Sequence, residues 1–572
     1  MTCQQRQQRR NRCWEDNMDE VRELDYINRQ FKSLFDDFEF WKPLFMDVRD
    51  FINPYIGYFD GETPNDGRRR DEEMLRTMPI KYSHILAAGL QWGITSPTRP
   101  WVKFAFQDAQ LMQNADVLNW LEAVKNIVLD VLFKGGYYPE NHKFYLELGC
   151  FCTAAMLIEE DDENVINCRT FTMGEYAIGV DSKRNPNQFA RTIQMTPFQI
   201  VEKFGLENVP DNVKRLYNDK NYNKFMKVKH LICPNKDEDP NKIDQESMKF
   251  TDYYWMEGQK DGQYLKKGGF NDFPVMIERY QTKGADTYGT GPGIWSLGDA
   301  KQIQLMWRTI CTAAELEVMP PTQGPSDAMK NGGINLYPAG ANYYNPGSGT
   351  DMGIKPIFDV KLNMADAVTV QQSIEECIKE HFNTKVFQLL SDMEKGTRTA
   401  REVIELSAEK MSQMGPLLER LQTGYLPQVV ERVLGIGFRA NIFPPPPQII
   451  QGMVMDIEFV SVLAQAQKQY GITPIMDTVN AIINMAATTQ QTSILDKINF
   501  DEVSDQIGGL NGVPPSIINS DDVVAQVRQQ RQQQEQQQQM AQNAMTAAQG
   551  AKTLAGADME GNNALTKLVG GQ

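Results

Sequence analysis

The longest helix predicted for this chain lies in its C-terminal half. Thr399-Ala400-Arg401-Glu402 has the pattern of a capping box, in which the first and fourth side chains satisfy backbone groups at the start of a helix. Pro416 and Pro427 each remove a backbone donor from the following stretch, so we expect kinks near both. The helix should stop at the proline run 444–447, which predicts one kinked element over 399–447. Its apolar stripe has spacings of mostly three and four residues and comprises Val403, Ile404, Met411, Met414, Leu418, Leu421, Tyr425, Val429 and Val433.

Two further helices bracket a small excursion. Ser296 with Asp299 three residues later predicts a capped helix over 297–319, which ends before two prolines. Residues 320–363 are rich in Gly, Pro and Asn and predict a small mixed structure. A second helix is predicted over 364–390, and the polar segment 391–398 then leads to the capping box. The apolar face of this second helix comprises Val368, Gln371, Ile374, Ile378, Phe382, Val386 and Leu389.

The N-terminal half changes character near residue 150. A polar arm, 1–18, precedes amphipathic stretches that predict helices at 19–53, about 71–94 and 112–134. Short β-prone runs broken by Gly, Asn, Asp and Pro follow from 150 to 282. One helix interrupts them, because Thr196-Pro197-Phe198-Gln199 combines an N-cap, a first-turn proline and a capping glutamine. The fold class is therefore α+β.

The region after 447 predicts more helix. Residues 449–500 have the pattern of a further helical unit, and a glutamine-rich tail follows. At 572 residues, with 41% apolar residues, the chain should form about three or four structural units, because single cores rarely exceed roughly 250 residues.

Charge and motifs exclude several functions. The formal net charge of −16 argues against a surface that binds nucleic acid through general positive charge. The chain has no G-x-x-x-x-G-K-[ST] phosphate loop, no serine-hydrolase elbow and no matched pair of C-x(2–4)-C motifs. We therefore expect Cys150 and Cys152 to be buried thiols. We expect Gly289–Gly293 to form a turn before the helix that begins at Ser296. We expect no enzyme activity, no cofactor, no metal, no secretory signal and no membrane span.

Several stretches resemble the head-to-tail connector, or portal, proteins of short-tailed bacteriophages. They lie in order between 86 and 447. They are LAAGL at 86–90, TSPTRPW at 95–101, RTIQMTPFQIVEKFG at 191–205, FP at 273–274 leading to Tyr280, YGTGP at 288–292, TRTAREV at 397–403 and GPLLERL at 415–421.

This resemblance implies a dodecameric ring at one capsid vertex, a passive channel for the packaging and ejection of double-stranded DNA. In the portal plan, 19–296 is the wing, 297–319 and 364–390 the stem, 320–363 the clip, 391–398 the tunnel loop and 399–447 the long wing helix. The crown is 448–515, and the Gln-rich end, 516–572, is either a barrel helix or disordered.

The resemblance also implies partners. These are other copies of the chain, the DNA, a separate terminase ATPase, tail adaptor proteins, and capsid and scaffolding proteins. The protein would be made in the bacterial cytoplasm and end in the virion. Two alternatives remain at this point: a non-viral helical scaffold or adaptor, and a nucleic-acid-processing enzyme. Images of the purified protein would separate them, because only a portal forms a ring with an axial hole.

Two sets of residues are predicted to act in the ring. Ile374, Ile378 and Phe382 form a stripe that one partner helix cannot fully cover, which predicts contact with a neighbouring subunit. The tunnel loop would face the channel, where Lys395 and Arg398 would touch DNA phosphates weakly; the alternative is a solvated connection. The polar residues of this loop are Asp392, Glu394, Lys395, Thr397 and Arg398.

Overall fold

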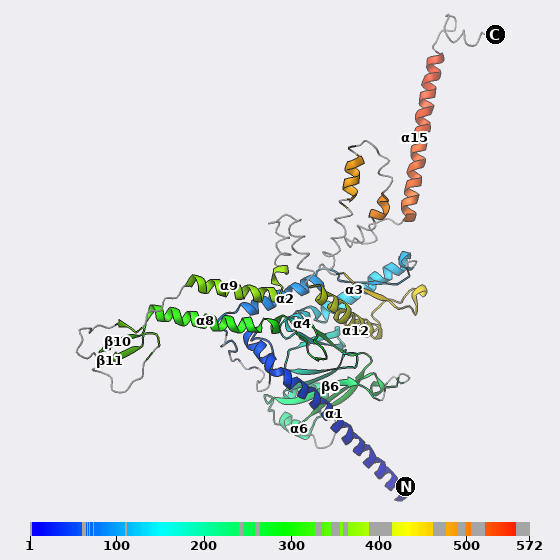
Figure 1. The fold of residues 1–572 in the computed structure, drawn as a ribbon. Helices are drawn as coiled ribbons and strands as arrows, with labels where there is room; N and C mark the ends of the chain where they lie inside the picture. Colours follow the sequence, from blue (N-terminus) through cyan, green and yellow to red (C-terminus); the bar gives the residue numbers. More distant parts are fainter. Residues whose placement is uncertain are drawn as a thin grey trace, which may run out of the picture. The chain divides into compact units, whose positions relative to one another are not determined.

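The computed structural model shows two units, Met1–Leu463 and Ala464–Gln572, which are described separately. The structure describes most of the chain (Figure 1). The residues outside the description are 1–2, 60–64, 66, 68, 73, 109–110, 237, 240–241, 243, 258–263, 326–334, 336, 345–354, 358–363, 388–413, 461–475, 477, 487, 489–497, 505–520 and 556–572.

Two antiparallel sheets form the centre of the first unit and confirm the β-rich region. The larger has the order β4-β5-β6-β7-β8, and the smaller has the order β3-β2-β9. The strands are β2 (Thr153–Asp161), β3 (Val165–Phe171), β4 (Tyr176–Val180), β5 (Pro186–Met195), β6 (Met226–Pro234), β7 (Phe250–Met256), β8 (Lys266–Phe270) and β9 (Val275–Arg279).

Helices α5 (Pro197–Phe204) and α6 (Asp211–Asn218) connect β5 to β6, and the short 3-10 helix η2 (Gln245–Ser247) precedes β7. The predicted capping box is confirmed. The Gln199 backbone N–H donates to Thr196 Oγ1 at 3.4 Å, and the Thr196 N–H donates to Gln199 Oε1 at 2.9 Å. Ile200 and Phe204 then pack with Val228 and Tyr254 of the sheet, so this local signal fixes where the connection begins.

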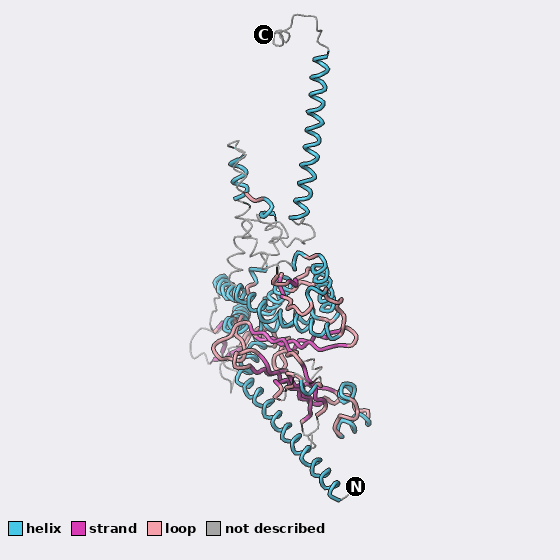
Figure 2. Tube along the Cα trace, turned by 90° about the vertical axis from the view of Figure 1, so that its right-hand side faces the viewer, coloured by secondary structure: helices cyan, strands magenta, loops and turns pink. Residues whose placement is uncertain are grey.

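Helices lie against both sheets (Figure 2). Helix α1 (Cys3–Phe51) packs on the five-stranded sheet, where the Phe31 and Trp255 rings meet edge to face at 5.4 Å. Helix α4 (Tyr137–Cys150) packs on the three-stranded sheet and on α2 (Met78–Ile94). The 3-10 helix η1 (Leu111–Gln113) and α3 (Ala115–Lys134) complete this layer.

Two N-terminal predictions need correction. Helix α1 begins at Cys3, so the helix includes most of the predicted polar arm. Helix α2 begins at Met78, where Pro79 occupies the first turn, and not near residue 71. The sequence analysis missed α4 because most of its side chains are buried, polar ones such as Asn141 and Glu147 included, which removes the amphipathic period.

Where it is described, the C-terminal part of the first unit is one helical run over 414–439 that is interrupted by a π-helical turn. The described part begins at Met414 and contains a π-helical turn, Leu421–Tyr425, followed by α12 (Leu426–Arg439). In that turn the Leu426 N–H donates to the Leu421 carbonyl, five residues back, directly before Pro427, which has no N–H. The irregularity expected near Pro427 is therefore present. The helix ends at Arg439, short of 447, and Asn441 adopts the left-handed conformation at φ 53°.

A buried polar network holds the π-helical turn. The Tyr425 hydroxyl donates to Asn141 Oδ1 at 2.7 Å, and Asn141 Nδ2 donates to Thr95 Oγ1 at 2.7 Å. The Tyr425 ring also stacks on Phe144 at 4.2 Å. The turn is thus joined to both α2 and α4.

The prediction of a helical unit from residue 449 onward is wrong for 451–460, which are not helical. The 3-10 helix η4 (Gln448–Ile450) leads to β13 (Asp456–Phe459), which pairs antiparallel with β1 (Val102–Ala105). This pairing joins residues far apart in the sequence, which a local pattern cannot reveal.

The second unit contains a long polar helix. Helix α15 (Asp521–Ala555) spans 35 residues, and its side chains from 526 to 549 are exposed within the chain. Of the two states considered for the Gln-rich end, the described residues 521–555 show the helix. A shorter helical stretch at 478–486 lies within the region 449–500 predicted to be helical, and another at 500–504 begins where that region ends.

Candidate functional site

A helical hairpin leads away from the sheets and is the main candidate for function. It consists of α8 (Leu297–Val318) and α9 (Met364–His381), which pack side by side (Figure 1). The segment that connects the two helices in the sequence forms a three-stranded sheet in the order β11-β10-β12. Its strands are β10 (Thr322–Pro325), β11 (Ala341–Tyr344) and β12 (Lys355–Pro356). Strand β10 is parallel to β11 and antiparallel to β12. The predicted excursion between two helices is confirmed.

The start of α8 lacks the predicted side-chain cap, because the Ser296 hydroxyl is used in another hydrogen bond. The short helix α7 (Pro292–Trp295) comes directly before it, and the Ser296 hydroxyl donates back to the Pro292 carbonyl at 2.7 Å. A Cβ at Gly289 or Gly293 would overlap the carbonyl of Cys152 or Cys150. The glycine cluster therefore packs closely on α4 and β2, in agreement with the predicted turn.

The base of the hairpin is attached to the segment before α2 through Gln304, a buried residue of α8. Gln304 Oε1 accepts from the backbone N–H groups of Leu75 and Arg76, each at 2.8 Å. Gln304 Nε2 donates to the Arg76 carbonyl at 2.8 Å. One amide side chain thus satisfies three backbone groups and fixes this segment against α8.

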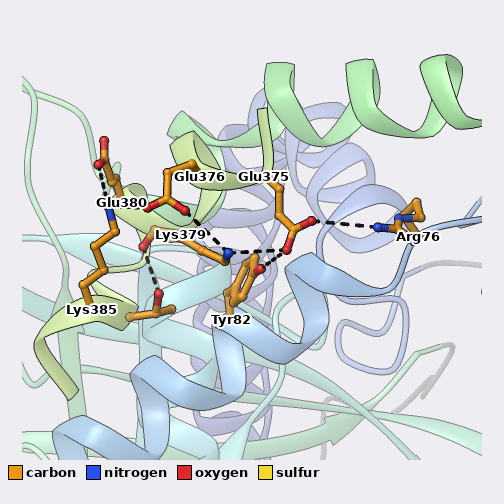
Figure 3. Close-up of polar contacts among 8 residues, drawn as sticks. Arg76, Tyr82, Glu375, Glu376, Lys379, Glu380 and Lys385 are labelled. Carbon is orange, nitrogen blue, oxygen red and sulfur yellow. Dashed lines mark hydrogen bonds and ion pairs between the residues drawn. The ribbon is translucent and has the colours of Figure 1, made fainter. Parts of the chain in front are cut away.

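The Arg76 side chain extends the attachment to α9 (Figure 3). Arg76 Nη2 lies 3.8 Å from Glu375 Oε2, and the guanidinium lies over the Trp307 ring at 4.6 Å. In the amide orientation that satisfies both groups, the Gln371 oxygen accepts from Arg76 Nε at 3.2 Å. We call Arg76, Tyr82, Gln304 and Glu375 the junction cluster, because together they join α2 and its preceding segment to both hairpin helices.

Charges and burial strengthen the cluster. Tyr82 donates to Glu375 Oε1 at 2.6 Å, and both burial and this carboxylate raise the Tyr82 pKa well above its usual value. Lys379 Nζ lies 3.5 Å from Glu375 Oε1. The pKa of Glu376 is lowered, chiefly by its hydrogen bond with Lys385. The side chains at the end of α9 are therefore held in an ionic network (Figure 3).

The structure places Ile374, Ile378 and Phe382, the residues of the predicted subunit contact, inside the chain. All three side chains are buried within the chain itself, Ile378 and Phe382 completely. Ile374 and Ile378 lie on α9, which contacts α8, α2 and α7 of the same chain. The second helix also stops short of 390: α9 ends at His381, and Asn383 adopts a left-handed conformation at φ 51° before a helical turn at 384–387.

The predicted tunnel-loop residues Asp392, Glu394, Lys395, Thr397 and Arg398 lie outside the described residues. The chain is described up to Phe387 and again from Met414. The capping box at Thr399 falls in the same interval.

The cysteines at the junction of α4 and β2 are buried in the fold. Cys150 and Cys152 are buried thiols, as predicted, and burial raises the Cys152 pKa to about 12. Within the described residues, no group of three or more His, Cys, Asp or Glu side chains is placed to hold a metal ion. No described helix is long and apolar enough to cross a membrane.

A second buried carboxyl group lies at the end of α4. Glu147 accepts from the Thr172 hydroxyl at 2.6 Å and from the Met173 N–H at 3.1 Å. Thr172 Oγ1 in turn accepts from the Gly57 N–H at 2.7 Å, which holds the segment after α1. Burial raises the Glu147 pKa to about 8. A smaller contribution in the same direction comes from the neighbouring carboxyl group of Glu175. These contacts join α4 to the segments around residues 57 and 172.

Sequence reasoning missed the junction cluster. Its two halves, Arg76 with Tyr82 and Gln304 with Glu375, are separated by more than 200 positions. Arg76, Gln304 and Glu375 are each ordinary surface-type residues in sequence. One sequence signal pointed towards the cluster: Gln371 is a polar residue within the otherwise apolar face of its helix, and it is buried in the structure.

The architecture is an α+β body with antiparallel sheets and a projecting helical hairpin, and comparison with known proteins gives its family. Residues 24–518 match the family of bacteriophage head to tail connecting proteins, and the chain belongs to this family. It is 32% identical over 548 residues to the portal protein of Salmonella phage epsilon15, covering 96% of this chain and 98% of that protein. It is 31% identical over 531 residues to a probable portal protein of Bordetella phage BPP-1, covering 93% and 95% respectively.

This membership confirms the resemblance seen in the sequence. The protein is a head-to-tail connector, a structural component of the virion and not an enzyme. Both the non-viral scaffold and the nucleic-acid-processing enzyme are therefore set aside.

Proposed function

We propose that twelve copies of this chain form a ring at one capsid vertex, through which double-stranded DNA enters and leaves the head. Family membership supports an oligomeric ring and the passage of DNA. The observation that carries the proposal is the hairpin α8–α9, which is fixed at its base by the junction cluster and carries a separate small sheet. Hairpins placed side by side would form the wall of a channel.

In this assignment the hairpin is the stem and β10–β12 the core of the clip. The wing comprises α1 to β9 together with α12, and the strand β13 belongs to the wing because it pairs with β1. Residues 391–398 form the tunnel loop at the inner end of the stem. The crown follows the wing, and α15 belongs to the C-terminal barrel region. The high negative charge suits a conduit, because like-charged walls do not retain a polyanion.

The contact between neighbouring stems would use the faces that the single chain leaves open. Leu305, at the centre of the open face of α8, is 65% exposed, and Val368 and Val370 of α9 are also exposed. Thr309 and Thr312 lie on the same face as Leu305, and their hydroxyls donate to carbonyls of their own helix at 3.0 Å. Their methyl groups therefore remain available for packing. This face replaces the buried stripe at Ile374 as the proposed interface.

The partners follow from this arrangement. The clip would bind the terminase ATPase during packaging and tail adaptor proteins afterwards, while the wing would contact capsid and scaffolding proteins. A separate motor is needed because the chain has no phosphate loop.

Electron microscopy of the purified full chain tests the proposal. We expect rings with an axial hole, and light scattering should give a mass near twelve times 65.1 kDa. Leu305→Asp should shift the protein towards monomers, because a charge would be buried between stems. Phe198→Asp, at an exposed site on α5, serves as the matched control and should leave the rings intact. A folded monomer without rings at any protein concentration would contradict the proposal.

A further inference from the structure

An apolar groove lies on the first unit, away from the hairpin. It has a volume of about 680 Å³ and lies between α3, α12 and residues 446–459. Helices α3 and α12 contact each other, and side chains of both line the groove, Trp120 from α3 and Leu434 among those from α12. Ligand pockets in proteins commonly span about 300 to 1,000 Å³, so the groove is large enough for several side chains of a partner.

The walls of the groove are held in place within the chain. Trp120 Nε1 of α3 donates to the Pro444 carbonyl at 2.9 Å, which fixes the proline run after α12. The pairing of β13 with β1 fixes the opposite wall, where the Phe459 ring stacks on Trp101 at 6.3 Å. Because these contacts lie within the chain, its own fold holds the groove walls in place, and binding would cost little further ordering of the chain.

Large apolar side chains remain exposed around the groove. Val454 is 85% exposed, and Phe438 and Met453 are each about half exposed. Met455 also lines it, and methionine adapts its shape to different apolar partners. Contiguous exposed apolar surface of this kind is typical of an interaction site.

The charged residues of the groove are of one sign. Glu431 and Asp456 line it, and no Lys, Arg or His is among its lining residues. Neither carboxylate pairs with a cation within the part of the chain that the structure describes. Partial burial, with a smaller contribution from Asp272, raises the Glu431 pKa. A cation placed here would therefore relieve an unfavourable arrangement.

We propose that this groove binds a segment of another protein, one whose apolar side chains are interspersed with Lys or Arg. The apolar residues would cover Phe438, Met453 and Val454, and one or two cations would pair with Glu431 and Asp456. This inference goes beyond the channel function, since it concerns a surface remote from the stem. It does not depend on ring formation.

The test uses the full chain and two labelled synthetic helical peptides of 14 residues, one of Leu and Lys and one of Leu and Glu. Fluorescence anisotropy in about 0.15 M salt measures their affinity, because this salt screens general attraction to an acidic protein. We expect the Leu/Lys peptide to bind and the Leu/Glu peptide to bind at least about tenfold more weakly.

Variants then locate the binding. Glu431→Gln with Asp456→Asn should weaken the Leu/Lys peptide about tenfold, and Val454→Ser should weaken it too. The control, Glu202→Gln with Asp211→Asn, removes the same charge from exposed positions on α5 and α6 and should have no effect. Unchanged thermal unfolding in all variants would confirm that they are folded.

Several results would overturn the inference. Equal weakening by the control pair would mean general charge attraction, and equal binding of both peptides would mean an unspecific apolar surface. Absence of peptide binding would mean that the groove is closed by a second copy or by residues beyond 460 of the same chain. Crosslinking from a photoreactive group at position 454 would then identify that occupant. If microscopy showed rings and any of these results were obtained, the proposed peptide binding in the groove would be rejected and the proposed channel function would stand.

Discussion

Replacing Gln304 should release the segment before α2 from the hairpin. Gln304→Leu keeps the size of the side chain but removes three hydrogen bonds of 2.8 Å: two from the Leu75 and Arg76 N–H groups and one to the Arg76 carbonyl. At about 1 kcal/mol for each net hydrogen bond, the loss is about 3 kcal/mol. Because roughly 1.4 kcal/mol corresponds to a factor of ten, local opening of this segment should become about a hundredfold more frequent.

Hydrogen exchange measures this opening directly at the amides of Leu75 and Arg76. A local assay is preferable to a single unfolding midpoint, since a chain with several units need not unfold in one step. Gln302→Leu is the matched control, because Gln302 is an exposed glutamine on the same helix. If Gln304→Leu left exchange at 75 and 76 unchanged, or if Gln302→Leu raised it equally, the junction cluster would not hold the hairpin as described.

Three further predictions concern other parts of the chain. The fold raises the Glu147 pKa from 4.5 to about 8, so the contribution of Glu147 to stability is present below about pH 4.5 and is lost as the pH rises through about 8. Glu147→Gln should therefore reduce the fall in denaturation midpoint between pH 5 and pH 8. The remaining fall would come from groups such as Glu278, whose pKa is also raised. An identical slope in wild type and variant would contradict this. Lys395→Glu with Arg398→Glu should leave folding and rings unchanged but lower the ratio of filled to empty capsids, whereas a merely solvated loop would give the wild-type ratio. The purified chain should not hydrolyse ATP with or without DNA, and turnover that persists through purification would refute this.

Local signals predicted some elements well because their causes are local. The Thr196 capping box involves residues three apart, and both of its hydrogen bonds are present. The helix 297–318 was bounded by Ser296 and by two prolines, yet Ser296 uses its hydroxyl differently, because the preceding turn already supplies a carbonyl acceptor. Here the boundary was right and the mechanism was wrong.

Long-range packing decided the rest. The stripe at Ile374, Ile378 and Phe382 indicated correctly that these side chains need cover, but not that the same chain provides it. The Gly89 backbone lies against the Phe387 ring so closely that a Cβ would overlap it, a contact that the sequence does not show. Likewise, β13 has no strand signal strong enough to compete with the helical pattern around it, and it exists because β1 offers an edge to pair with. The junction cluster and the groove both depend on such contacts and were not predictable.

The hairpin leaves and re-enters the body at neighbouring points, since α7, which precedes α8, contacts α9. The segment from Leu297 to His381 is thus an insertion in the body of the protein, and the junction cluster holds both of its helices at their base. The attachment uses Gln304 near the start of α8 and Gln371, Glu375 and Lys379 in the later part of α9. Equal numbers of residues added to both helices beyond these positions would displace β10–β12 by about 1.5 Å per residue and leave the base untouched. The spacing between the body and its terminal sheet is therefore an independently adjustable length, and one connector could be matched to a different partner by lengthening the helices alone.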